Sequence, residues 1–211
     1  RDARRMARDE FLQCWYNRAS ADLYHLGPVG HERLVSAFLR AQLWQASAEG
    51  AILNQAFETS FGNMSGATIR VRLTGLAQPP KPVSRIRLCL HGHPDEGLTL
   101  SKLYVGPKSA SACGASSLTQ LRVNAASVFT VPAGAQLWTD WAPFSWDRAT
   151  DLIASFYGDG GSGSDRLHAH SGGGCTTFLK SVDDAATLEP ADFTAYANWL
   201  SLVTKIETDG F

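Results

Sequence analysis

The spacing of hydrophobic residues along the chain changes close to residue 50. Before that point, large apolar residues recur every three or four positions in two runs separated by Gly27-Pro28, which predicts two amphipathic helices. After it, apolar and polar residues alternate with a period of two, as expected of half-buried β-strands. We therefore predict a helical hairpin over residues 1–50 and a β-domain over residues 51–211.

Short alternating runs, separated by Gly, Pro and Asp, predict about ten strands in the β-domain. In the run TIRVRL, the alternation directs Ile69 and Val71 toward a core and Arg70 and Arg72 outward. Many short strands joined by turns indicate an antiparallel sandwich of the jelly-roll type, and the sequence VPAGA predicts a tight turn at residues 132–134. The predicted strands are 54–61, 68–73, 85–90, 98–105, 118–123, 127–131, 136–139, 151–157, 175–179 and 200–207.

The composition limits the classes of partner. Charged residues make up 18% of the chain against 44% hydrophobic residues, and the net charge is −1, so we expect a folded protein that does not bind nucleic acid. No apolar run approaches 18 residues, so membrane insertion is not expected. The two predicted helices are too apolar to remain alone in water, which predicts docking on the sheet, a protein partner or self-association.

Cysteine spacing and the start of the chain add two expectations. The four cysteines form no CxxC pair, which disfavours a structural zinc site. Cys89 alternates with leucines and is predicted to be buried, whereas Cys113 and Cys175 lie in Gly/Ser-rich loops and their pairing is left open. The chain begins without Met or an apolar signal segment, so we expect it to be a piece of a longer protein.

Catalytic patterns are weak, and we predict a protein that is not an enzyme. There is no GxSxG elbow, and no pair of acids is set apart from surface carboxylates. The HxH motifs at 91–93 and 168–170 place two imidazoles on one strand face, but two ligands leave a transition-metal site incomplete, so a metal is left open. No cofactor is predicted. Calcium is the alternative left open, through Asp95, Glu96, Asp159 and Asp165.

The segment WTDWAPFSW carries three tryptophans within nine positions, and aromatic faces stack on sugar rings. Trp141 and Trp146 are the predicted exposed pair, with core packing as the alternative for each. We expect a ligand site at one loop end of the sandwich. The Gly-rich interval 158–174 is predicted to be a loop, with mobility as its simplest interpretation. The predicted ligand-binding residues are Trp141, Trp146, His91, His93, Asp95 and His168.

Four segments carry a resemblance to a known family: TIRVRL (68–73), LTLSKLYV (98–105), VPAGA (131–135) and DLIASFY (151–157). In this order they resemble the non-catalytic β-sandwich attached to many bacterial SGNH hydrolases, and they are similar to jelly-roll modules of phage-like spike and fibre proteins. The resemblance covers about residues 66–207. It implies a jelly-roll fold, and His168 is similar to the loop histidine after the family's last long strand. The catalytic blocks of SGNH hydrolases are absent.

Together, these features predict a non-catalytic carbohydrate-binding or adhesion module. We expect a spike or fibre subunit of a virus-like particle, extracellular or on the virion surface, which recognises a cell-surface polysaccharide. The helices at residues 1–50 lie outside the resemblance and look like an added docking or oligomerisation element. Two alternatives stay open: a purely structural assembly subunit, and an accessory domain of an SGNH-type or metal-dependent hydrolase.

Overall fold

The computed structural model describes residues 51–54, 56–57, 59–63, 65–159, 166–171 and 175–210. They belong to one compact unit, Gly50–Phe211. The predicted helical hairpin lies outside the described residues and stays a prediction. The strands are β1 (Ala51–Asn54), β2 (Thr59–Asn63), β3 (Ala67–Leu73), β4 (Val83–His91), β5 (Leu98–Pro107), β6 (Thr119–Gln120), β7 (Phe129–Val131), β8 (Gln136–Trp138), β9 (Ala142–Trp146), β10 (Leu152–Gly158), β11 (Arg166–Ser171), β12 (Thr176–Lys180), β13 (Thr194–Ala197), β14 (Trp199–Ser201) and β15 (Val203–Thr208).

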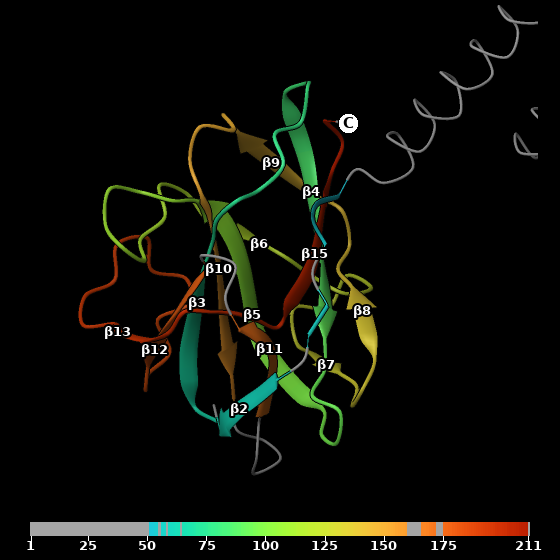
Figure 1. Cartoon of the computed structure of the whole chain (residues 1–211), viewed down its shortest axis with the longest axis vertical. Helices are drawn as coiled ribbons and strands as arrows, with labels where there is room; N and C mark the ends of the chain where they lie inside the picture. Colours follow the sequence, from blue (N-terminus) through green and yellow to red (C-terminus); the bar gives the residue numbers. More distant parts are fainter. Residues whose placement is uncertain are drawn as a thin grey trace, which may run out of the picture. The chain divides into compact units, whose positions relative to one another are not determined.

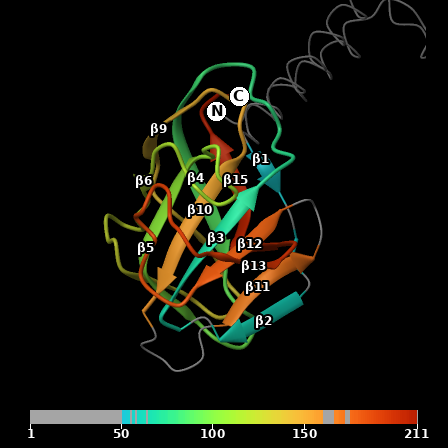
Figure 2. The ribbon, with the colours of Figure 1, turned by 90° about the vertical axis from the view of Figure 1, so that its left-hand side faces the viewer.

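The described part of the chain is mainly β and contains no helix. Its strands pair antiparallel in three sheets. One sheet has the order β1-β15-β4-β8, with β9 also on β4, and a second has the order β13-β12-β3-β10-β5-β6, with β7 also on β5. Figure 1 shows β3, β10 and β12 on one side of the domain and β4, β8 and β15 on the other. The third sheet, β14-β11-β2, lies near one end of the domain (Figures 1 and 2).

Alternation along the strands builds the core between the two larger sheets. Ile69 and Val71 of β3 and Leu88 of β4 are buried in one apolar cluster, together with Phe156 of β10 and Ile206 of β15. Each of these residues is flanked by neighbours that point to the opposite face of its sheet. The predicted mainly β, antiparallel, sandwich-like architecture is therefore confirmed.

Several predicted strands differ from those observed, each for a local reason. The interval 158–174, predicted to be a loop, contains β11, whose short run RLHAHS is flanked by glycines that hide its pattern. The strand predicted at 200–207 is divided in two by Leu202, which has a φ of 65°. The strand predicted at 54–61 is replaced by β1 and β2, while β9 and β13 were missed altogether.

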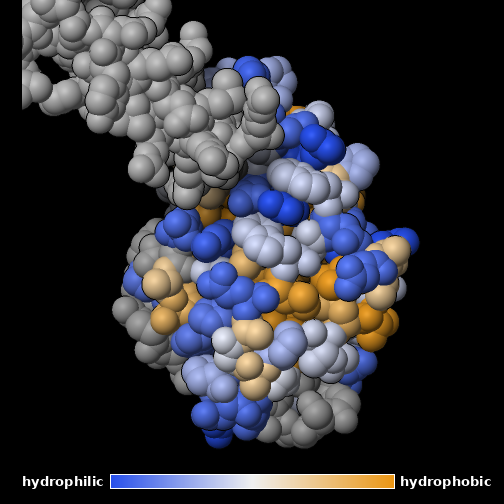
Figure 3. Space-filling model, turned by 90° about the vertical axis from the view of Figure 1, so that its right-hand side faces the viewer, coloured by the Kyte–Doolittle hydropathy of each residue, from blue (hydrophilic) through white to orange (hydrophobic). Residues whose placement is uncertain are grey.

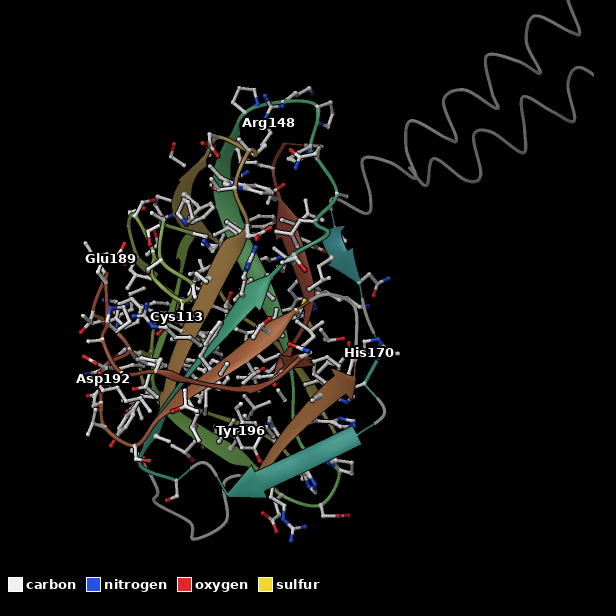
Figure 4. All side chains as sticks on the ribbon, turned by 60° about the vertical axis from the view of Figure 1, so that its left-hand side comes forward. Cys113, Arg148, His170, Glu189, Asp192 and Tyr196 are labelled. Carbon is white, nitrogen blue, oxygen red and sulfur yellow. The ribbon has the colours of Figure 1, made fainter. Side chains whose placement is uncertain are left out.

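Arg70 corrects the expectation of a solvated outer face on β3. Its side chain points away from the core, as predicted, yet the residue is 0% exposed. Its guanidinium donates to the carbonyl oxygens of Cys113 (2.9 Å), Asp184 (3.3 Å) and Thr187. Two long connections therefore cover this face of the sheet, and Figure 4 shows Cys113, Glu189 and Asp192 on the side of the domain away from His170.

Candidate functional site

Strand β4 organises the candidate site. Arg85, Arg87, Cys89 and His91 occupy its outer face, because the residues between them are buried in the core. Arg87 and His91 are four residue steps apart, a distance of about 13 Å along the strand. Trp138 and Trp141 meet side chains of this face at one place, and His168 meets His91 at another. This face, on the side of the domain viewed in Figure 3, mixes hydrophilic residues with smaller hydrophobic areas.

Two arginines and two tryptophans alternate at the first place. The guanidinium carbon of Arg87 lies 4.5 Å from the ring centre of Trp138 and 4.7 Å from that of Trp141. The guanidinium carbon of Arg85 lies 5.4 Å from the ring centre of Trp141. All three distances are within the range of cation–π attraction. We call these four residues the Arg–Trp stack.

Carboxylates hold the two arginines to different degrees. Arg87 donates from Nε to Oε2 of Glu207 (2.7 Å), and its Nη2 lies 2.5 Å from the same oxygen. Arg85 reaches Oδ2 of Asp209 only at 3.5 Å, the outer limit of a hydrogen bond, and its side chain is 58% exposed against 32% for Arg87. Arg87 is therefore fixed in place, while Arg85 is loosely held.

The carboxylate of Asp209 accepts most of its hydrogen bonds from groups other than the Arg85 side chain. It accepts hydrogen bonds from the Ser84 amide (2.8 Å), the Ser84 hydroxyl (2.5 Å) and the Arg85 amide (3.0 Å). Burial works to raise the pKa of Asp209, but these hydrogen bonds outweigh it and hold that pKa at about 2. Asp209 thus stays ionised at neutral pH without depending on the guanidinium beside it.

The two tryptophans predicted to be exposed behave differently. Trp141 is 38% exposed, so its prediction is confirmed, but Trp146 is only 4% exposed, so that prediction is wrong. Trp146 belongs to β9, where the alternate residues Ala142, Phe144 and Trp146 all point into the core. Its indole nitrogen donates to the carbonyl oxygen of Thr150 at 2.9 Å, so the ring is buried with its polar group satisfied.

The predicted gathering of all site residues at one loop end is also wrong. Trp146 pairs with Val83 and Gln136 pairs with His91, which places Trp146 and His91 at opposite ends of β4. Eight residue steps along a strand span about 26 Å. The sequence alone could not show this separation, because it depends on the pairing of β9 with β4. β9 runs antiparallel to β4 and carries Trp146 away from the histidines.

The second place, at the His91 end of β4, is the histidine cluster of the half-buried His91 and the buried His93 and His168. The ring centres of His91 and His168 lie 4.8 Å apart, and Phe57 stacks on His91 at 5.8 Å and meets His168 edge-on at 5.4 Å. The Nδ1 atoms of His91 and His168 are buried and have no hydrogen-bond partner among the described residues. Burial, and then the neighbouring His91 and His93, lower the pKa of His168.

His93 and Asp95 shape the loop beside this cluster. His93 is buried, and its Nδ1 accepts a hydrogen bond from the Asp95 amide at 3.2 Å, so the aspartate contacts it through backbone. The predicted turn at 132–134 is confirmed: Ala135 donates to the Pro132 carbonyl at 3.2 Å, and Gly134 has a φ of 63°. Gly134 also donates to the His93 carbonyl at 2.8 Å, which joins the turn to the histidine loop. We interpret His93 as a packing residue.

The described residues give little support for a metal site or for a reactive thiol. Within the described ranges, no group of three or more His, Cys, Asp or Glu side chains is arranged to hold a metal ion. Of the calcium ligands considered above, Asp165 lies outside those ranges. Cys89, Cys113 and Cys175 are buried free thiols, so the predicted burial of Cys89 is confirmed and Cys113 is not bonded to Cys175. Burial raises the pKa of the Cys89 and Cys113 thiols, which disfavours the reactive thiolate.

Comparison with known proteins identifies no family for this chain. No family model matches the chain, and no curated protein matches it significantly. No helix in the part of the chain that the structure describes is long and apolar enough to cross a membrane.

The partners of Trp141 were missed by sequence reasoning. Arg85 and Arg87 come from β4, more than 50 positions before Trp141, and Glu207 and Asp209 come from the end of the chain. The alternating run RIRLCL did predict that both arginines leave the core on one face. Only the pairing of β4 with β8, β9 and β15 brings these residues together.

Proposed function

We propose that this protein is a non-catalytic carbohydrate-binding module that binds a polysaccharide at the Arg–Trp stack. The observation that carries the proposal is the exposure of Trp141 on a sheet face where Arg87, anchored by Glu207, holds both Trp141 and Trp138. An aromatic side chain fixed before binding loses little conformational freedom when a ligand arrives. Such a ring offers a flat apolar surface to the C–H face of a sugar.

The polar side chains around the stack suit the same ligand. Sugar hydroxyl groups both donate and accept hydrogen bonds, and the stack places guanidinium donors next to the carboxylate acceptors Glu207 and Asp209. Because Arg85, Arg87 and Glu207 lie on strands β4 and β15 rather than at a loop tip, their side chains start from a fixed backbone. The stack therefore combines a stacking surface with polar groups that can orient a sugar ring.

The wider assignment follows the resemblance of segments 68–73, 98–105 and 151–157 to sandwich modules of SGNH hydrolases and phage-like spikes. We propose a jelly-roll topology, a helical docking or oligomerisation element at residues 1–50, and an extracellular or virion-surface location. The ligand in this proposal is a cell-surface polysaccharide. The surface bound is the outer face of β4, β8 and β15, and the buried Trp146 and His93 take no part in contacting it.

The test compares two exposed aromatic residues by affinity electrophoresis in gels that contain different polysaccharides. Trp141→Ala is expected to weaken binding by about thirtyfold, the loss typical of a central aromatic contact worth about 2 kcal/mol. Tyr196→Ala is the matched control, because Tyr196 is an exposed aromatic residue on β13 of the other large sheet. This variant should bind like the unchanged protein.

Two results would overturn the proposal. One is the absence of retardation in every polysaccharide tested, which would favour a purely structural assembly subunit. The other is equal retardation of the Trp141→Ala variant and the unchanged protein, with both folded by circular dichroism.

A further inference from the structure

The two arginines of the Arg–Trp stack are not equivalent, although they leave the same face of β4. The Arg87 fork is engaged by Glu207 through two of its nitrogens. The Arg85 fork makes only the long contact from Nε to Asp209, and within the described residues its two terminal nitrogens have no hydrogen-bond or ion-pair partner. A planar group with two parallel donors is therefore presented next to Trp141 without an acceptor.

Arg85 also controls access to the indole ring. Its guanidinium lies over the ring of Trp141, as does that of Arg87, so this ring is already in contact with two of the protein's own cations. A sugar that stacks on Trp141 competes with these cations for the ring. Arg85 is the one that can move, because it is more exposed and its link to Asp209 is long.

The charges facing this region favour an anionic ligand. Arg85, Arg87 and Lys205 lie on the outer face of β4 and β15, against the carboxylates of Glu207 and Asp209. Glu207 is neutralised by Arg87, and Asp209 is held by Ser84 and by backbone amides. Three cations thus face two carboxylates, and this surface keeps a net positive charge that favours an anionic ligand.

We infer that the polysaccharide is acidic, built from sugars that carry carboxylates, and that Arg85 is the residue that selects it. This inference rests on the proposed function. The carboxylate takes the two terminal nitrogens of Arg85 in the bidentate arrangement that a guanidinium fork favours, and this draws Arg85 off the ring. The sugar ring then stacks on the part of the Trp141 ring that Arg85 has left.

The experiment uses the full chain and matched pairs of polymers: polygalacturonate, alginate and hyaluronan, each beside its methyl-esterified, uncharged form. The unchanged protein should bind at least one acidic polymer about tenfold more tightly than its ester, and less so as salt is raised. Arg85→Gln should remove this preference and leave binding to the ester unchanged or stronger. Arg72→Gln, which removes the same charge from β3 in the other sheet, is the control and should keep the preference.

The outcomes separate this inference from the proposed function. Equal binding of each acid and its ester, or an equal effect of Arg85→Gln on both, overturns the selection of acidic sugars and leaves the carbohydrate proposal in place. Tighter binding to dextran sulfate than to every polyuronate shows general anion attraction and overturns carboxylate recognition. Binding to no polysaccharide overturns both proposals.

Discussion

Removing the buried charge of Arg70 should destabilise the domain strongly, although Arg70 is remote from the proposed binding surface. We consider Arg70→Met, which keeps a long side chain and removes every donor. The guanidinium donates to the carbonyl oxygens of Cys113 (2.9 Å), Asp184 (3.3 Å), Leu188 (3.5 Å) and Thr187, and lies 5.5 Å from the ring centre of Phe193. These contacts attach the two covering connections to β3.

The magnitude follows from which of these acceptors can reach water once the donor is lost. The Cys113 carbonyl accepts in a buried hydrogen bond, and a charge-assisted bond of this kind contributes about 1.5–3 kcal/mol. Thr187 and Leu188 belong to an exposed segment, so water can replace part of their loss. The variant no longer buries a cation, which offsets some of the cost. We expect a net loss of about 3 kcal/mol in the free energy of unfolding.

Urea unfolding, followed by circular dichroism, measures this loss. With a slope of about 2 kcal/mol per molar urea, the midpoint should fall by about 1.5 M. Arg72→Met is the control: Arg72 leaves the same face of β3, is half-exposed and pairs with Asp151 at 2.7 Å, so its removal should cost less than about 1 kcal/mol. Limited proteolysis should also cleave Arg70→Met first within residues 181–193. A midpoint for Arg70→Met within error of the Arg72→Met midpoint would refute this reasoning.

Two further predictions concern the histidine cluster and its support. The pKa of His168 is lowered from 6.5 in the folded state, so the unfolded state binds a proton more readily. The free energy of unfolding is therefore at its full value above about pH 6.5 and should fall as the pH drops below that value. Urea midpoints at about pH 7.5 and about pH 5.5 should therefore differ less in His168→Gln than in the unchanged protein, and an equal difference contradicts the prediction. Gly92→Ala should cost about 3 kcal/mol, because its Cβ would overlap the backbone carbonyl oxygen of Pro132, which cannot rotate away. Gly66→Ala is the control: its Cβ would meet no atom within 4 Å, and only the φ of 68° is unfavourable, so its cost should be about 1 kcal/mol. Similar urea midpoints for the two variants would contradict the steric explanation.

The sequence alone predicted the strands whose pattern is complete within one run. β3, β5 and β10 lie in the runs predicted to be strands at 68–73, 98–105 and 151–157, and the predicted inward direction of Ile69 and Val71 is confirmed. β9 was missed because Pro143 interrupts its short run, although Pro143 is exposed and the residues on either side of it are buried. β11 was missed because glycines surround a run of only six residues.

The candidate site was predictable in part. The local sequence pattern drew attention to the tryptophans and to the HxH motif at 91–93, but it did not distinguish the exposed Trp141 from the buried Trp146. These two residues are five positions apart, and their environments depend on how β9 lies against β4. Arg87, the centre of the Arg–Trp stack, gave no signal beyond its outward direction, because both of its ring partners and its carboxylate come from distant segments of the chain.

Arg70 and Arg72 illustrate the boundary between the two kinds of information. The chain's alternation determined that both leave the core on the same face of β3, because successive side chains on a strand point to opposite sides. Only the tertiary structure decided that Arg70 is buried and Arg72 is half-exposed, since the segments that cover Arg70, at Cys113 and Asp184, lie 43 and 114 positions later in the chain. Alternation is a local property of the backbone, whereas exposure depends on which distant segment packs over each face.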